Sequence, residues 1–275
     1  MYEEAFFHIL NSIHNKYKLD SVAIAGGCGF NSVANGKVLQ NTPYKKLYVQ
    51  AAAGDAGGAI GAAFTTWHKI GGQKATRRGQ SHDHAYWGPS FSDKYCDVLL
   101  EKEKQKIEEE DCIVSYFHNV SDLIKKTAAG IADGKVIGWF QGRMEWGPRA
   151  LGNRSIIGDP RRKDMKDILN IKIKRRESFR PFAPSIMHEK VSEWFEQNDD
   201  VPFMMQVYQI LECQRAKIPA VTHVDGSGRL QTVSKESSPR YYALIDEFYQ
   251  RTKVPMILNT SFNENEPVVC KPEEA

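Results

Sequence analysis

The sequence predicts an α/β protein, because short apolar or β-branched runs alternate with segments whose apolar residues recur at helical spacing. The strand candidates end in glycine or turn residues and lie at 21–27, 47–50, 135–140 and 254–258. At 275 residues the chain is longer than a typical domain, which predicts two domains.

The first part begins with a helix at 2–17, whose apolar stripe comprises Phe6, Ile9, Leu10, Ile13 and Tyr17. A glycine turn follows the first strand, and a helix is expected from Asn31. The small residues of 51–64 allow the next helix to lie close to backbone or to a flat ligand, with Phe64 and Trp67 turned toward the core. The aperiodic stretch 69–110 indicates a connector with a helical piece.

The second part is expected to open with a helix capped by Ser121, which leads through Gly134 into the strand 135–140. Further elements are predicted from their patterns: a short amphipathic helix near 191–195, a strand at 203–210, a helix with the stripe Tyr241, Leu244, Ile245 and Phe248, and the strand 254–258.

Charge and cysteine content exclude several classes of protein. The net charge is only +3, and the basic residues gather in a few places, which argues against a nucleic-acid binder. No run approaches the roughly 20 apolar residues of a spanning helix, and no signal peptide is evident, so we expect no membrane association and a cytoplasmic location. Five scattered cysteines predict reduced thiols, and Cys28 is expected in the core rather than as a nucleophile.

Four stretches combine cations or short polar groups with rigid Gly or Pro: FQGRMEWGPRALGNRS (140–155), KIKRRESFRPFAP (172–184), HVDGSGRLQTV (223–233) and NTSFN (259–263). A single arginine is usually a solvated surface charge. Surface charges do not require Gly or Pro beside them, however, and arginine guanidinium groups on rigid loops hold phosphate or carboxylate groups well. The set therefore predicts a polyanion pocket, although spacing leaves open whether Lys172 or Lys174 contacts the ligand.

The first part carries weaker signals. AGGCGFN (25–31) is compatible with a nucleotide-binding turn or simply with a tight turn. Asp55 lies at a bend before a glycine-alanine helix, where a metal or ribose contact and a helix N-cap are equally compatible with the spacing. SHDH (81–84) contains metal-ligand residue types, but one loop without a further ligand disfavours a metal site.

In this order, AGGCGFNSVANGK, QAAAGDAGGAIGAAF, GWFQGRMEWGPRALGNRSI, LNIKIKRRESFRPFAPSI, THVDGSGRLQTV and VPMILNTSFNENEPVV resemble the carbamoyltransferases of the NodU/CmcH type. The resemblance covers nearly the whole chain. It implies the C-terminal part of a domain of the actin and sugar-kinase superfold (ASKHA) with a connector over 1–100. It further implies a YrdC-like α/β domain with a twisted mixed sheet over 112–275.

The resemblance also implies a two-step reaction. Carbamoyl phosphate gives carbamate, which attacks ATP to form carbamoyl-adenylate, and an iron-type ion (Fe²⁺) positions this adenylate while an acceptor hydroxyl takes the carbamoyl group. Mg²⁺ accompanies ATP. The implied pocket residues are Arg149, Lys174, Arg180, Arg229 and Ser261, with Arg143 and Asn259 as second choices. In the kinase-like part, Asp55 matches the metal ligand, and the nucleotide-contacting positions are Gly26, Gly27, Asn31 and Gly57.

Members of this family are about twice as long, and their H-x-x-x-H metal helix has no counterpart among the eight histidines here. We therefore expect a fragment or one half of a split protein, partnered by an N-terminal half, with a small-molecule or oligosaccharide acceptor. Two alternatives remain: a YrdC-like module that makes threonylcarbamoyl-adenylate from threonine and bicarbonate, and a non-catalytic nucleotide-binding half of a split enzyme.

Overall fold

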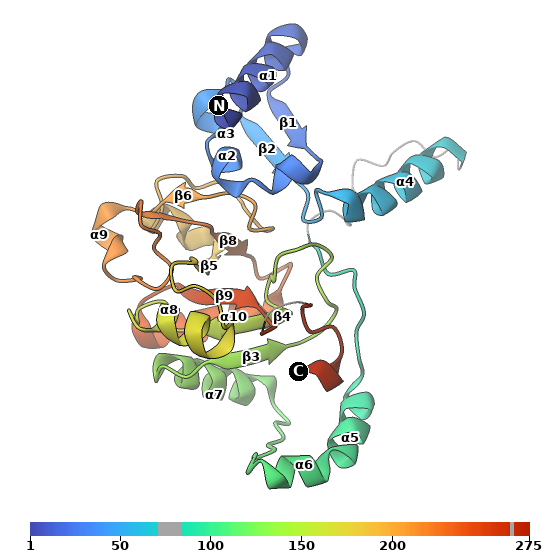
Figure 1. Ribbon diagram of the computed structural model, residues 1–275, viewed down its shortest axis with the longest axis vertical. Helices are drawn as coiled ribbons and strands as arrows, with labels where there is room; N and C mark the ends of the chain where they lie inside the picture. The colour runs from blue at the N-terminus through green and yellow to red at the C-terminus, as the bar shows by residue number, and fades with distance from the viewer. Residues whose placement is uncertain (71–83, 265–266) are drawn as a thin grey trace.

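The computed structural model describes residues 1–70, 84–264 and 267–275. Its first part is a small α/β unit at the top of Figure 1, in which two strands pair in parallel from Ser21↔Lys46 to Ile24↔Val49. In chain order its elements are α1 (Tyr2–Tyr17), β1 (Ser21–Ile24), η1 (Gly27–Phe30), α2 (Ser32–Gly36), α3 (Val38–Asn41) and β2 (Lys46–Val49). The predicted helix and both strands are therefore present.

Hydrogen bonds attach this unit to the rest of the molecule. The buried Asn35 amide donates to the carbonyls of Gly29 at 2.8 Å and Met205 at 3.0 Å, which are far apart in sequence. The Val207 amide also donates to the Ser32 carbonyl at 3.0 Å. The bonds to Met205 and from Val207 cross the junction, so the two parts are joined by specific contacts.

The connecting helices α4 (Asp55–Ile70), α5 (Asp93–Lys102) and α6 (Lys104–Glu109) extend along one side of the molecule (Figure 1). The prediction that Trp67 turns toward the core is wrong, because its side chain is 60% exposed. None of the residues of α4 is buried, so its apolar side chains have no core to enter. Helical spacing alone cannot reveal whether a neighbour covers the stripe.

The second part is built on a five-stranded sheet in the order β3-β4-β9-β5-β8. Its strands are β3 (Ile137–Phe140), β4 (Arg154–Gly158), β5 (Ala183–Met187), β8 (Gln231–Val233) and β9 (Met256–Ser261). Only β5 and β8 pair in parallel, so the sheet is mixed, as predicted. Helices α7 (Val120–Ala132) and α10 (Pro239–Thr252) pack against each other and against β3, β5 and β9.

Short elements complete the second part: α8 (Met165–Asp167), the π-helix η2 (Ile168–Ile173), η3 (His188–Glu193), β6 (Tyr208–Gln209), α9 (Glu212–Arg215), β7 (Ser227–Gly228) and η4 (Pro272–Glu274). The predicted strand at 203–210 is reduced to the two residues of β6. Met204 has a φ of 57°, which is incompatible with an extended chain and ends the strand pattern there.

Helices of the second part follow their sequence signals closely. The predicted stripe of α10 is fully buried, and Pro239 occupies the start of the helix, where its missing N–H is harmless. The cap of α7 is Asn119, whose side chain accepts from the Ser121 amide at 2.8 Å, so the expected Ser121 cap is two residues too late. Asparagine and serine are equivalent caps, and only the backbone decides between them.

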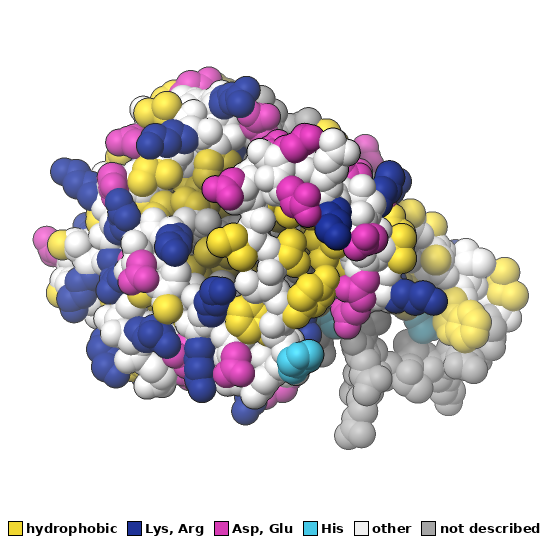
Figure 2. Space-filling view, turned by 90° about the horizontal axis from the view of Figure 1, so that it is seen from below, with side chains coloured by type: hydrophobic (Ala, Val, Ile, Leu, Met, Phe, Trp, Pro, Cys, Tyr) yellow, Lys and Arg dark blue, Asp and Glu magenta, His cyan; other side chains and the backbone are white. Residues whose placement is uncertain are grey.

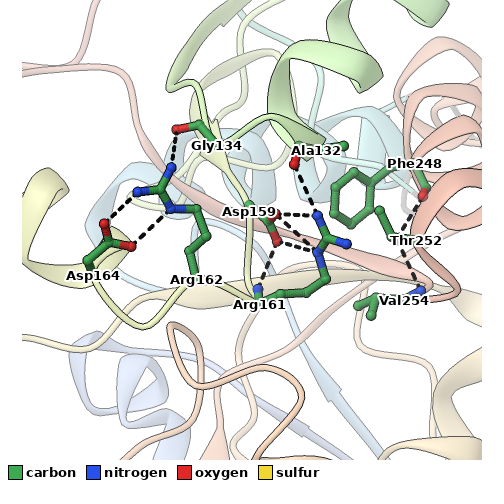
Figure 3. A network of polar contacts seen from close by, with 9 residues as sticks. All are labelled: Ala132, Gly134, Asp159, Arg161, Arg162, Asp164, Phe248, Thr252 and Val254. Atoms are coloured by element: carbon green, nitrogen blue, oxygen red, sulfur yellow. Dashed lines mark hydrogen bonds and ion pairs between the residues drawn. The ribbon is translucent and has the colours of Figure 1, made fainter.

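Contacts of Arg161 fix the end of β4 (Figure 3). The Arg161 guanidinium donates to the buried Asp159 carboxylate at 2.6 Å and to the Ala132 carbonyl at 3.2 Å, and it lies 5.4 Å from the ring of Phe248. These contacts tie the sheet to α7 and α10 at the end of β4 that lies opposite the loop from β3.

The surface carries both signs of charge. On the face shown in Figure 2, basic and acidic side chains are interspersed, with hydrophobic side chains between them. Within the described ranges no helix combines the length and the apolar character that a membrane span requires.

Candidate anion-binding site

The loop between β3 and β4 carries three arginines that look equivalent in sequence but have different environments in the structure. Arg154 is fully buried, donates to the carbonyls of Gln141 at 2.7 Å and Asn153 at 2.9 Å, and lies 3.6 Å from the Phe140 ring. Its guanidinium therefore holds the loop together and is not available to a ligand.

Arg143 points elsewhere in the same loop. It is exposed and donates to the carbonyls of Trp87 at 2.8 Å and Gly88 at 3.0 Å, so it fastens the connector to the sheet. Arg149, by contrast, is half-buried, and its buried Nε atom has no hydrogen-bond partner among the described residues. Of the three forks, only Arg149 is left for a ligand.

A π-helical turn decides between the two lysines. Lys174 follows η2, and its backbone amide bonds the Leu169 carbonyl, five residues earlier. Its buried ammonium donates to Ser261 and to the backbone carbonyl and side-chain oxygen of Asn263, the latter two at 2.8 and 2.6 Å. Lys172 is exposed on the same turn. Lys174 and Ser261 are thus brought together at the end of β9.

Arg176 belongs to the same cationic loop but was not predicted. The fully buried Asn170 organises this loop: its side-chain amide donates to the carbonyls of Ser178 at 3.1 Å and Arg180 at 3.0 Å, while its oxygen accepts from Arg176 Nε at 2.8 Å. Sequence offered no signal to separate Arg176 from the neighbouring cations, because the selection depends on a contact with Asn170.

Arg229 lies between β7 and β8, after a turn that leads into β7. The Asp225 carboxylate accepts from the Ser227 amide at 3.1 Å and from its hydroxyl at 2.6 Å, and Gly226 has a φ of 80° that a side chain would strain. The DGSG sequence therefore forms a closed turn. Arg229 leaves this turn half-buried, and its buried Nε has no hydrogen-bond partner in the described part of the chain.

The pKa values indicate that these cations face one another. Burial, with added repulsion from Arg149 and Arg176, lowers the pKa of Arg229 to about 9. Burial and Arg176 lower the pKa of Lys174 to about 8, and burial also lowers the pKa of Arg149. Such shifts record charged groups that are desolvated beside like charges. We call Arg149, Lys174, Arg176 and Arg229 the cation cluster.

Within the described part of the chain, no carboxylate forms an ion pair with a member of this cluster, although the charge of Glu177 partly offsets the lowering of the Arg176 pKa. The ion pairs between described residues leave out all four of its members. Arg180, also predicted for the site, is exposed and bonds the Glu177 carboxylate at 2.9 Å, although its charge still lowers the pKa of Arg176. Arg180 therefore lies at the rim rather than inside the cluster. Desolvated cations without acidic partners are characteristic of anion-binding sites.

Asn259 supports the cluster from β9. It is 1% exposed, and its side-chain amide lies within hydrogen-bonding distance of the Ala150 carbonyl at 3.0 Å, Ser185 Oγ at 3.0 Å and Gln231 Oε1 at 3.1 Å. Asn259 therefore holds the residue that follows Arg149 and does not itself project as a free ligand contact.

The predicted nucleotide-contacting residues of the first part lie apart from this cluster. Gly26, with a φ of 104°, and Gly27 form the turn after β1, and no atom lies within 4 Å of an added Cβ at either position. Asn31 caps α2 by accepting from the Ala34 amide at 3.1 Å. A Cβ on Gly57 would lie 2.1 Å from the Ala52 carbonyl oxygen, so this glycine is required for packing.

The described residues do not by themselves form the expected metal site. Asp55 is exposed at the first position of α4, and no group of three or more His, Cys, Asp or Glu side chains suited to a metal occurs within the described ranges. Of SHDH, His82 and Asp83 lie outside those ranges. The prediction that Cys28 is a core residue is wrong, since it is exposed in η1, where the following Gly29 fills the buried position instead.

A cavity of about 670 Å³ is separate from the cation cluster. It is lined by β2 and by parts of 200–237, and it includes the side chains of His84, Asp200 and Glu236 but no lysine or arginine. The cations therefore lie at loop ends rather than in this cavity.

The second part is thus a mixed-sheet α/β domain with four desolvated cations at its loop ends, a charge arrangement that is compatible with anion binding. The chain matches the family profile "Carbamoyltransferase C-terminus" over residues 128–275 and "Carbamoyltransferase N-terminus" over residues 1–64. It belongs to the carbamoyltransferase family.

Three relatives show how far the similarity extends. An uncharacterized protein of Synechocystis is 41% identical over 99% of this chain and 47% of its own length. The nodulation protein NolNO of Sinorhizobium fredii is 43% identical over 97% of this chain and 38% of its own length. NolO of Bradyrhizobium diazoefficiens is 40% identical over 99% and 49%. The chain thus spans about half of these relatives or less.

Proposed function

We propose that this protein uses carbamoyl phosphate and ATP to form carbamoyl-adenylate, from which the carbamoyl group passes to a hydroxyl of an acceptor. The observation that carries the proposal is the cation cluster, in which four cations are desolvated together and form no ion pair with a carboxylate of the described residues. Membership of the carbamoyltransferase family supplies the reaction class. A triphosphate and a carbamoyl donor provide the negative charge that such a cluster lacks.

The chemistry balances in three steps. Water cleaves carbamoyl phosphate to carbamate and phosphate. A carbamate oxygen then attacks the α-phosphorus of ATP, the bond to the bridging oxygen breaks, and pyrophosphate leaves. Finally, an acceptor hydroxyl attacks the carbamoyl carbon, loses its proton and releases AMP, which gives the O-carbamoylated product.

The residues have distinct roles in this proposal. Arg149 and Arg229 bind phosphate oxygens through paired N–H groups, and Lys174 supplies a point charge at the end of β9 beside the Ser261 hydroxyl. Arg176 and Arg180 complete the binding surface from the loop that Asn170 holds. Fixed cations lower the barrier by positioning the reactants and by neutralising charge as it develops on the departing pyrophosphate.

The remaining components of the reaction stay proposals as well. Mg²⁺ would accompany ATP, and a sugar or other small-molecule hydroxyl would be the acceptor. Asp55 can offer one carboxylate to an iron-type ion, but because the described residues provide no complete ligand group, further ligands would be required. Gly26, Gly27 and Asn31 would contact nucleotide in a separate step of the reaction.

Exchange of labelled pyrophosphate into ATP tests the adenylation step. Carbamoyl phosphate should be required for exchange, and Arg149→Gln should abolish it while Arg251→Gln, a paired residue on α10, leaves it intact. If the purified chain neither catalyses exchange nor binds either substrate, the proposed function is wrong.

The same assay separates the alternatives. Exchange that depends on threonine and bicarbonate in place of carbamoyl phosphate would favour the threonylcarbamoyl-adenylate reaction. Substrate binding without turnover, restored to turnover by a separate chain that covers the remaining half of the relatives, would favour a non-catalytic half of a split enzyme. The complementation experiment is included because this chain covers only about half or less of the length of its relatives.

A further inference from the structure

Glu145 is a buried carboxylate in the loop that carries Arg149, and the functions above leave it unassigned. It is 6% exposed, and one of its oxygens accepts from the backbone amides of Leu151 at 2.7 Å, Asn153 at 2.8 Å and Arg154 at 3.3 Å. Buried amides in a loop require acceptors, and here a single side chain provides them. The loop is therefore folded around this carboxylate.

We infer that Glu145 is the positioning residue of the anion site, because it fixes the backbone from which Arg149 projects. This inference rests on the proposed function. The segment after Arg149 is held at two consecutive points: Asn259 bonds the Ala150 carbonyl at 3.0 Å, and Glu145 accepts from the next amide. Both contacts hold the peptide unit between Ala150 and Leu151, directly after Arg149. The backbone that carries Arg149 is therefore fixed on its C-terminal side, so the arginine needs less reorganisation when an anion binds.

The charge of Glu145 does not cancel that of Arg149. Burial alone lowers the pKa of Arg149, with no carboxylate opposing it, whereas the Coulombic influence of Glu145 falls on Arg154. Arg154 in turn is occupied by the carbonyls of Gln141 and Asn153. Glu145 therefore stabilises the loop while leaving the cation that faces the ligand free of an acidic competitor.

Asp159 provides a matched control at the other end of the same strand. It is also a buried carboxylate, it is bonded by Arg161, and it lies after β4, whereas Glu145 precedes it (Figure 3). Glu145→Gln and Asp159→Asn each neutralise a buried carboxylate in this domain. Only the first lies in the loop that carries Arg149.

The test measures pyrophosphate binding by calorimetry for wild type, Glu145→Gln, Arg149→Gln, the double variant and Asp159→Asn. Glu145→Gln should weaken binding about 10- to 100-fold, as losses of supporting groups do in other sites. In the Arg149→Gln background it should cause no further loss, because a positioning residue acts through the residue that it positions. Asp159→Asn should bind pyrophosphate as wild type does.

An NMR signal provides a readout that stability alone would not change. The Arg149 Nε–H resonance should shift when pyrophosphate is added to the wild-type protein and should respond less in Glu145→Gln. Additive losses in the double variant, or an equal loss in Asp159→Asn, would overturn the inference while leaving the proposed function intact. Absence of pyrophosphate binding by the wild-type chain would overturn both.

Discussion

Replacing Arg229 with methionine should stabilise the ligand-free protein and at the same time weaken its response to anions. The pKa of Arg229 is lowered to about 9 because its guanidinium is desolvated beside Arg149 and Arg176. A lowered pKa in the folded state means that folding disfavours the charged form. At neutral pH the side chain is charged in both the folded and unfolded states, so this penalty is fully present.

The magnitude follows from the size of the pKa change. Each pKa unit corresponds to about 1.4 kcal/mol, and because the side chain retains some exposure, screening reduces the total to about 2 kcal/mol. Methionine keeps the unbranched stem and removes the charge, and Arg229 gives up no ion pair among those of the described residues. For a domain of this size, 2 kcal/mol raises the melting temperature by about 4–8 °C.

Thermal unfolding with and without pyrophosphate measures both effects. The variant should melt higher than wild type without pyrophosphate, whereas the increase caused by pyrophosphate should be smaller, since ligand stabilisation follows affinity. Arg251→Met, on the surface of α10 and paired with Glu247, should change stability by less than about 0.5 kcal/mol. A lower melting temperature for Arg229→Met without anion, combined with a wild-type response to pyrophosphate, would refute the reasoning.

Three further predictions concern other positions. The pKa of Lys174 is lowered to about 8, so the affinity of the protein for sulfate should fall as the pH rises through about 8, a range in which the charge of sulfate is constant. The Lys174→Arg variant should retain its sulfate affinity over the same range. A sulfate affinity of the wild-type protein that does not change with pH would contradict the assignment. The pKa of Lys174 is 10.5 in the unfolded chain and about 8 in the folded protein, so the folded protein loses this proton at the lower pH. The free energy of unfolding of the ligand-free protein, measured with urea, should therefore rise between about pH 8 and pH 10.5. Arg143→Ala should leave pyrophosphate affinity within about twofold of wild type in the same calorimetric titration, because the side chain bonds two carbonyls outside the cluster, and a large loss would place it in the site. Gly57→Ala should lower the free energy of unfolding by about 1–3 kcal/mol, because the added methyl group clashes with Ala52. Gly58→Ala, whose methyl group meets nothing within 4 Å, should raise it by about 0.5–1 kcal/mol. Urea unfolding midpoints that shift in the same direction for both variants would contradict this.

Elements with a strong local period were predictable from sequence. α1, α10 and β9 each lie within a few residues of their expected positions, because side-chain spacing and terminal residues decide them locally. The prediction of a strand at 203–210 was wrong because Met204 has a left-handed backbone conformation, which a hydropathy pattern does not indicate. Trp67 failed for a related reason, since a pattern specifies the face of a helix but not whether another element covers it.

The sequence indicates residue types and stretches for the candidate site, but it does not distinguish individual side chains within them. The loop 140–155 offers three arginines with similar neighbours, and only the fold shows that Arg143 and Arg154 bond carbonyls while Arg149 does not. Lys174 differs from Lys172 because a π-helical turn buries one of them, and Arg176 belongs to the cluster because it bonds Asn170. Each distinction arises from a contact between residues that a linear pattern treats alike.

The cation cluster keeps its charge because the groups that hold its loops in place form no ion pair with its cations. Asn170 and Asn259 provide amide hydrogen bonds, and Lys174 donates to oxygens of Ser261 and Asn263. A carboxylate in any of these places would stabilise the empty site, but an anion would then have to displace it, and breaking a buried ion pair costs about 3–5 kcal/mol. Glu145, the carboxylate buried in this loop, bonds backbone amides instead. The free energy lost by desolvating the cations is therefore recovered only when an external anion binds.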